Sequence, residues 1–176
     1  MKGPRHFGRL DQEFTMTRLF AALTLTLVGL ALAAPPAPPA PAPAFPKEYR
    51  RWLHSKSMVI PDKAHGLYGF HHVYVEPKAL EAYRTGKDYP EGSRLVVPFH
   101  EVNETGGMVQ EGALRSVAVM QRDASAKDTG GWRWAMFDPK GKAMQLDVKS
   151  ACFNCHIPKK DRAYVFSEWV EPTTGE

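Results

Sequence analysis

Cysteine is scarce in this chain: its 176 residues include only two, Cys152 and Cys155. Two cysteines are too few for a disulfide framework. A tetrahedral zinc site built on them would need a second pair of ligands, and only the adjacent His71 and His72 form such a pair. No cysteine follows the N-terminal apolar stretch, which excludes lipid attachment at that point.

The net charge of the chain is also small. The formal net charge is +4, and residues 1–33 contribute a surplus of two positive charges to it. Lys and Arg do not gather into a basic patch, so no nucleic acid partner is expected. With 43% hydrophobic and 24% charged residues, the composition is typical of a folded, soluble domain.

The sequence lacks an apolar run of the about 20 residues that a membrane span requires. Its longest run, from Leu19 to Ala34, has 16 residues, follows Arg18 and contains the small-x-small pattern Ala31-Leu32-Ala33. These features predict a signal peptide over residues 1–33, with Met16 as its true start, and therefore an exported, periplasmic protein. A signal that is not cleaved would instead tether the protein to the membrane.

Residues 34–46 consist almost wholly of Pro and Ala and include seven prolines. Such a tract favours the extended polyproline II conformation and predicts a stiff linker. The remaining residues, 47–176, are of a length suited to one domain.

The two cysteines belong to the sequence Cys152-Phe153-Asn154-Cys155-His156, a Cys-x-x-Cys-His pattern. Each thiol can add to one vinyl group of a porphyrin, and the adjacent histidine can then bind the iron. We therefore predict one covalently attached haem c per chain, with His156 as the iron ligand. A thioredoxin-type redox pair would follow a strand in a βαβ unit, which the sequence pattern does not show. A plain disulfide leaves His156 unexplained.

No methionine follows the motif, so the usual downstream second ligand of small electron-transfer cytochromes is missing. A five-coordinate iron with room for a small molecule is expected. The alternative is a six-coordinate electron carrier that uses an upstream methionine. The methionines of the expected domain are Met58, Met108, Met120, Met136 and Met144.

Hydrophobic periodicity predicts an α+β domain built mainly on an antiparallel sheet with a few packed helices. Helices are expected over Lys47–Ser55 and over Pro77–Tyr83, the second ending at Gly86. Alternation of apolar residues predicts three strands, over 94–99, 116–120 and 132–137. Val73–Val75 and Tyr164–Trp169 are predicted as additional edge strands.

Several motifs in the same order resemble the cytochrome P-460 family. They are His71-His72-Val73-Tyr74-Val75, Gly86-Lys87, Pro90-Glu91-Gly92-Ser93, Thr129-Gly130-Gly131-Trp132, Ala151 to His156, and Asp161 to Phe166. The resemblance runs from about Trp52 to the C-terminus. It implies a β-rich fold, a homodimer, and one c-type haem per chain bound by His156.

The family has two branches, which differ in the distal pocket. Cytochromes P-460 oxidise hydroxylamine and have a Lys bonded to the porphyrin, whereas the cytochromes c′-beta lack this bond and bind nitric oxide and carbon monoxide in an apolar pocket. In our alignment the crosslinking Lys corresponds to Val97, and no Lys occurs between residues 88 and 126.

The resemblance therefore favours the c′-beta branch. It implies a protein that binds nitric oxide and exchanges electrons with a redox partner, and it assigns no catalytic residues. Hydroxylamine or nitric oxide oxidation is the alternative. Phe70, Val97 and Phe99 are the candidates for the distal wall, and alternation places His100 on the strand face opposite Val97 and Phe99.

Overall fold

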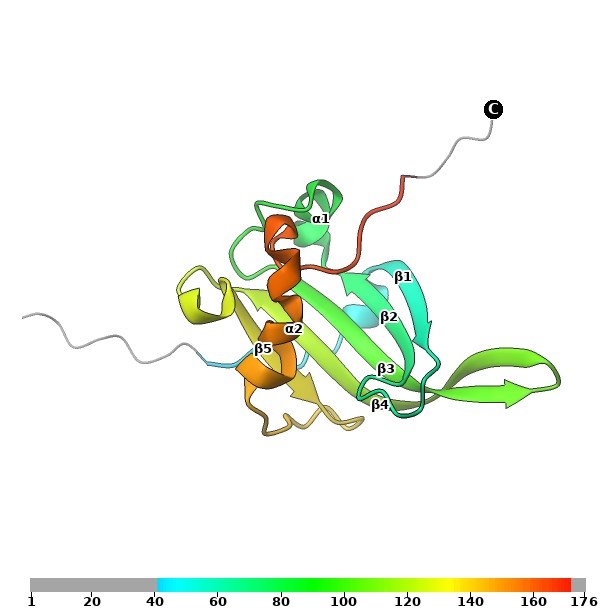
Figure 1. Cartoon of the computed structure of the whole chain (residues 1–176). Coiled ribbons are helices and arrows are strands. Elements are labelled where there is room, and N and C mark those ends of the chain that lie inside the picture. The colour runs from blue at the N-terminus through cyan, green and yellow to red at the C-terminus, as the bar shows by residue number, and fades with distance from the viewer. Residues whose placement is uncertain (1–40, 172–176) are drawn as a thin grey trace, which may run out of the picture. The chain divides into compact units, whose positions relative to one another are not determined.

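The computed structural model describes residues 41–171, which form an antiparallel meander of five strands in the order β1-β2-β3-β4-β5 (Figure 1). The strands are β1 (Leu53–Ile60), β2 (Gly69–Val75), β3 (Arg94–Thr105), β4 (Met108–Arg122) and β5 (Trp132–Phe137). This architecture confirms the predicted α+β class with a mainly antiparallel sheet. The expected signal peptide and most of the Pro/Ala-rich segment lie outside the described residues.

Short helices precede β1, connect β2 to β3 and β4 to β5, and follow β5. They are the 3-10 turns η1 (Tyr49–Arg51), η2 (Pro77–Ala79) and η3 (Lys127–Thr129), the α-helices α1 (Leu80–Thr85) and α2 (Asn154–His156), the π-helical η4 (Lys149–Phe153) and the 3-10 η5 (Ile157–Arg162). The helix expected after Pro77 is present, and Gly86 ends it with a left-handed φ of 77°. Glycine adopts this conformation without the steric penalty that a Cβ atom brings.

The helix predicted over Lys47–Ser55 is wrong. Helical geometry stops at Arg51, and residues from Leu53 onward pair with β2, from Leu53 opposite Val75 to Ile60 opposite Gly69. β1 is an edge strand with mostly exposed side chains, so it shows no apolar alternation, and pairing with its neighbour overrides its local pattern. Val73–Val75, predicted at an edge, belongs to a strand with neighbours on both sides.

Tyr164–Trp169 is not a strand either. The backbone reverses at Ala163 and Tyr164, whose φ angles are 50° and 65°, and the segment beyond them joins no sheet. At the other end, the folded domain begins before the expected boundary at residue 47. The Pro46 side chain is fully buried, and the Phe45 ring contacts Phe137 with centroids 5.3 Å apart.

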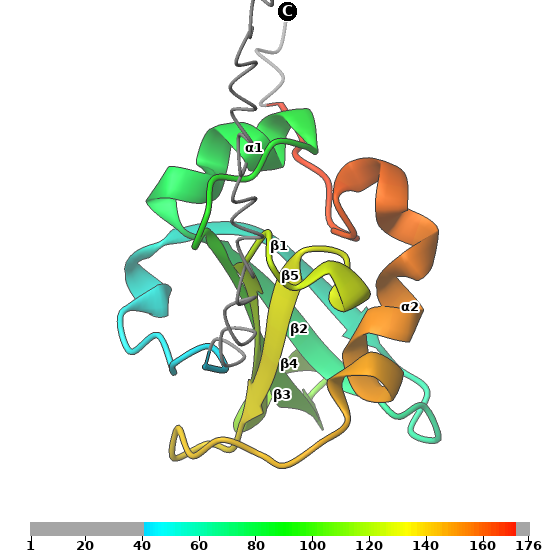
Figure 2. The same ribbon diagram turned by 90° about the vertical axis from the view of Figure 1, so that its left-hand side faces the viewer.

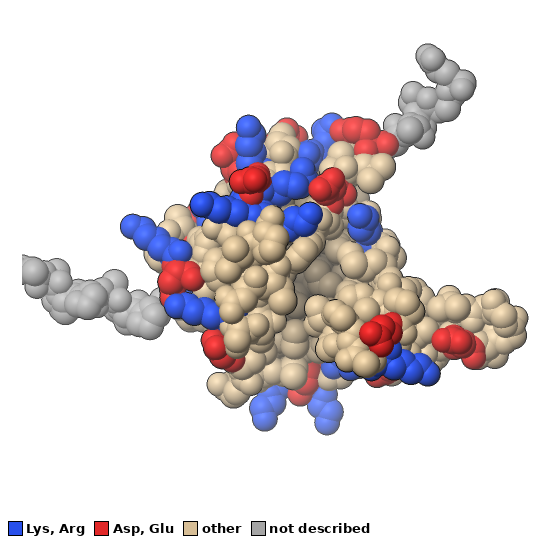
Figure 3. Space-filling view, viewed as in Figure 1, with Lys and Arg blue, Asp and Glu red and all other residues tan. Residues whose placement is uncertain are grey.

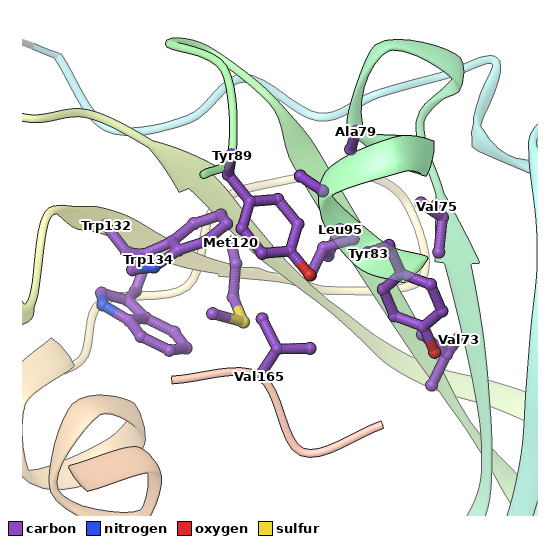
Figure 4. Packing of buried hydrophobic residues seen from close by; sticks show 11 residues of the cluster. Val73, Val75, Ala79, Tyr83, Tyr89, Leu95, Met120, Trp132, Trp134 and Val165 are labelled. Carbon is purple, nitrogen blue, oxygen red and sulfur yellow. The ribbon is translucent and has the colours of Figure 1, made fainter. Parts of the chain in front are cut away.

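The sheet has two faces with different covers, seen on its two sides in Figure 2. We call the first the helical face, because the C-terminal helical run lies over it, while α1 at one end of the sheet adds Ala82 and Tyr83 to the same core. Its core contains Val73, Val75, Ala79, Ala82, Tyr83, Tyr89, Leu95, Met120, Trp132, Trp134 and Val165, most of which Figure 4 labels. We call the second the N-terminal face, because Phe45, Tyr49 and Trp52 cover it. There Val96, Val117, Val119, Ala135 and Phe137 are buried.

The turn after η3 fixes the position of the C-terminal segment. Gly130 has a φ of 71°, and a Cβ atom built on it would lie 2.5 Å from Cε2 of the Tyr164 ring. Only glycine fits both the left-handed backbone and this close approach of the ring.

We therefore expect Gly130→Ala to lower the free energy of unfolding by about 2 to 4 kcal/mol, since it combines a left-handed backbone penalty with overpacking. Gly66→Ala is the matched control, because no atom lies within 4 Å of its added Cβ. Urea denaturation of the two variants measures the difference. Equal stability of both variants would contradict the role of Gly130.

Candidate functional site

The Cys-x-x-Cys-His motif lies in one continuous helical run made of η4, α2 and η5. Asp147 starts this run: its carboxylate accepts hydrogen bonds from the Lys149 amide at 3.1 Å and from the Ser150 hydroxyl at 2.8 Å. The spacing of three and four residues places Cys155 and His156 on neighbouring positions of the helix surface relative to Cys152. Cys152 packs against the core of the helical face.

The imidazole of His156 is held by a backbone atom. Its Nδ1 lies 2.6 Å from the carbonyl oxygen of Tyr164, which the chain reversal at residues 163 and 164 brings back toward the helix. An Nδ1–H that donates to this carbonyl leaves Nε2 with the free electron pair that a metal requires. The rings of Trp134 and Phe166 contact the imidazole edge-on, with centroids 4.6 and 4.7 Å away.

Burial lowers the pKa of His156, so its imidazole is neutral near pH 7 and can act as a ligand. Sequence analysis did not identify the Tyr164 carbonyl, Trp134 or Phe166 as parts of this site. The Tyr-Val-Phe ending contains two of these residues, but nothing in it indicates that the chain turns back onto the motif.

The two thiols are not joined to each other: both cysteines are free, Cys152 half-buried and Cys155 exposed. Burial raises the pKa of the Cys152 thiol to about 11. Redox-active Cys-x-x-Cys pairs have an attacking thiol with a lowered pKa, which is the opposite of this environment. The thiol chemistry here is that of a protonated, partly buried cysteine next to an apolar surface.

The centre of the helical face is less covered than the centre of the N-terminal face. On β3 and β4, Val97, Ser116 and Ala118 point to the helical face and are half-buried. Their neighbours Val96 and Val117, which point to the N-terminal face, are 0% exposed. Figure 3 shows the corresponding hollow, lined by uncharged residues, between α2 and the connection from β1 to β2.

The register places two of the three candidates for the distal wall on this face. Val97 packs against the core of the helical face, and Phe99 contacts the ring of His71 with centroids 4.5 Å apart. Phe70 does not join them, because it pairs with His100 and lies beside His72 on the N-terminal face. The prediction of one wall formed by all three residues is therefore wrong for Phe70.

The prediction that His100 points away from Val97 and Phe99 is confirmed. Its Nδ1 bonds the carbonyl oxygen of Gly112 at 3.0 Å on the N-terminal face. His71 is the histidine that points to the helical face, where its Nε2 donates to the carbonyl oxygen of Leu67 at 2.7 Å.

Three strand stretches form the centre of the helical face, and none of them contains a lysine or a carboxylate. They are Leu95 to Phe99 on β3, Ser116 to Met120 on β4 and Trp132 to Met136 on β5. Among the residues of the five strands, the one lysine is Lys56 on β1. It pairs with Val73 at the sheet edge, and its side chain is exposed. The exposed Lys78 lies instead near the carbonyl oxygen of Glu91, at 3.4 Å.

These residues fit a haem. A flat apolar group can cover the half-buried centre of the helical face, and His156 presents a neutral imidazole beside two free thiols.

None of the helices within residues 41–171 is both long enough and apolar enough to cross a membrane.

Comparison with known proteins agrees with this fit. No curated protein matches the chain. The model of the family described as Cytochrome P460 matches residues 46–167, which span the sheet, the helical run and the Cys-x-x-Cys-His motif. The chain therefore belongs to the Cytochrome P460 family, and its cofactor is haem.

Proposed function

We propose that this protein is an exported c-type haem protein that binds nitric oxide and similar neutral diatomic ligands, as the cytochromes c′-beta do. Cys152 and Cys155 would hold one haem c covalently, and His156 would ligate its iron. Held in this way, the haem would supply an iron that can bind a small neutral ligand. The observation that carries the proposal is the apolar, half-buried helical face at Val97, the position that our alignment matches to the crosslinking lysine of the cytochromes P-460.

Three features of the helical run support covalent attachment. The thiols are free, the cysteines have the spacing of haem attachment motifs, and the histidine next to them has its Nδ1 bound to a backbone carbonyl. The hydrogen bond from Nδ1 orients the ring and makes Nε2 a better electron donor to a metal.

The chemistry of the wall supports a neutral ligand. Oxidation of hydroxylamine requires removal of protons, and a base must lie within hydrogen-bond reach of the substrate. Val97 and Phe99 offer no such base, and the short stretches of β4 and β5 on the same face have no carboxylate. The imidazole of His71 lies on this face, but its Nε2–H is engaged by the carbonyl oxygen of Leu67. Nitric oxide binds haem iron without a distal hydrogen bond, so an apolar wall admits it and disfavours charged ligands.

The protein's surroundings follow from the sequence and the family. The predicted signal peptide supports a periplasmic location, where cysteines and haem meet during attachment. A redox partner would keep the iron ferrous, and the family resemblance favours a homodimer.

The first prediction concerns ligand binding. The ferrous haem protein is expected to have an ordinary c-type spectrum, with a Soret band that shifts on addition of nitric oxide or carbon monoxide. Hydroxylamine with an artificial electron acceptor is expected to give no turnover. Steady hydroxylamine oxidation would overturn the proposal, and failure of the ferrous protein to bind carbon monoxide would favour a six-coordinate electron carrier.

The second prediction concerns the wall. Val97→Lys is expected to alter the haem spectrum, because it places an amine on the half-buried helical face, whereas Val97→Leu, which enlarges the side chain without adding an atom that can ligate iron, is expected to leave the spectrum unchanged. Lys56→Met tests the one strand lysine and is expected to have no spectral effect. A changed spectrum in Lys56→Met would show that a lysine already reaches the haem.

The third prediction concerns attachment. Haem staining of denaturing gels is expected to detect no covalent haem in the double variant Cys152→Ala/Cys155→Ala. Each single variant should keep one thioether bond, with a pyridine haemochrome band shifted to the red. Asn154→Ala, between the two cysteines and exposed, is the control and should stain like the unmodified protein. Full staining of the double variant would rule out these attachment points.

A further inference from the structure

A second group of ligating side chains lies on the N-terminal face, away from the haem motif. His72, His100 and Glu111 each present one ligand atom, and these atoms lie within 4.8 Å of one another. They come from three neighbouring strands, β2, β3 and β4. Together they form a set of two imidazoles and one carboxylate.

We propose that these three residues form a binding site for a divalent transition metal ion of the zinc type. Imidazole nitrogen and carboxylate oxygen are the donors that Zn²⁺ prefers, and a set of two His and one Glu leaves a fourth position for water. Glu111 has 47% of its side chain exposed, so the site opens toward solvent on that side.

The buried histidine has the orientation that a ligand needs. His100 is 3% exposed, and its Nδ1 bonds the carbonyl oxygen of Gly112 at 3.0 Å. If Nδ1–H donates there, Nε2 has the free electron pair. Within residues 41–171, this buried Nε2 has no hydrogen-bond partner. A buried, unpartnered nitrogen costs free energy, and a metal ion would satisfy it.

His72 has a matching second-shell contact. Its Nδ1 lies 2.8 Å from the hydroxyl oxygen of Ser57, which also lies 3.0 Å from Nε2 of His54. Its own Nε2 is 2.6 Å from Oε2 of Glu111, yet the described residues offer it no aligned hydrogen bond. Two atoms this close share a proton. A zinc ion bound to both at about 2.0 Å would replace that proton and separate the two atoms to about 3.3 Å, the spacing of tetrahedral ligands.

The backbone brings Glu111 to this place through two irregularities. The β3–β4 register shifts between Phe99 and His100 and again between His100 and Val102, so that Glu111 pairs with Val102. Bulges of this kind re-aim side chains and are common beside functional sites. An ion here would join the base of the long β3–β4 hairpin, visible in Figure 1, to β2.

The test uses the haem-loaded protein. A chelator first removes metal ions other than the haem iron, and the protein is then titrated with zinc chloride in a calorimeter. We expect one zinc ion per chain and an unchanged Soret band. Glu111→Gln and His100→Gln should each weaken binding at least tenfold. The controls are Glu104→Gln, an exposed carboxylate in the same hairpin, and His65→Asn, an exposed histidine outside the cluster; both should bind zinc as the unmodified protein does.

Glu111 is exposed, so its variant tests the site even if His100→Gln fails to fold. Zinc affinity equal in Glu111→Gln and the unmodified protein would overturn the proposal, as would binding only at millimolar zinc. A shift of the Soret band in step with zinc binding would also overturn it, because the ion would then be at the haem site. Nitrogen hyperfine splitting in the electron paramagnetic resonance spectrum of the copper(II)-loaded protein would support the two histidine ligands.

Discussion

Successive side chains of a strand point to opposite faces of its sheet, and this alternation decides which residues of the protein can meet. His71 and His72 are neighbours in sequence, yet one contacts Phe99 on the helical face and the other contacts Glu111 on the N-terminal face. Phe99 and His100 separate in the same way. The sheet therefore separates two groups of side chains with different chemistry. The group around Val97 and Phe99 is mainly apolar, and the group of His72, His100 and Glu111 presents nitrogen and oxygen atoms.

The two faces also differ in how completely the chain covers them. On the N-terminal face Tyr49 and Phe45 close the middle of the sheet, where Val117 is 0% exposed. On the helical face the surface is hollowed beside α2 (Figure 3), and Val97 stays half-buried. A haem bound on this face would complete this half of the core and would link cofactor binding to the stability of the folded domain, because a group bound only by the native state stabilises it.

The sequence alone was sufficient for local features and insufficient for those that depend on register. The end of α1 at Gly86 is a local pattern, and the opposite directions of Val97 and His100 follow from counting along a single strand. Phe70 was misplaced because its face depends on how β2 pairs with β3, which no residue pattern specifies. The Tyr164 carbonyl could not be predicted because it is a backbone atom, brought to His156 by two left-handed residues that are not glycine. The start of β1 was predicted as part of a helix because its residues show no apolar alternation. It is a strand because it pairs with β2.

The histidine cluster depends on register even more strongly. Phe99 pairs with Ser116, and if this register continued along the hairpin, a residue other than Glu111 would lie opposite Val102. The two register shifts around His100 place Glu111 there instead. Glu111 arrives at the cluster only through these shifts, so the ligand set is a property of the folded hairpin. Because Phe99 and His100 are consecutive, an ion held by His100 would restrain the backbone of β3 directly beside the helical face. It would do so without placing any polar group there, which leaves the apolar character of the wall at Val97 and Phe99 intact.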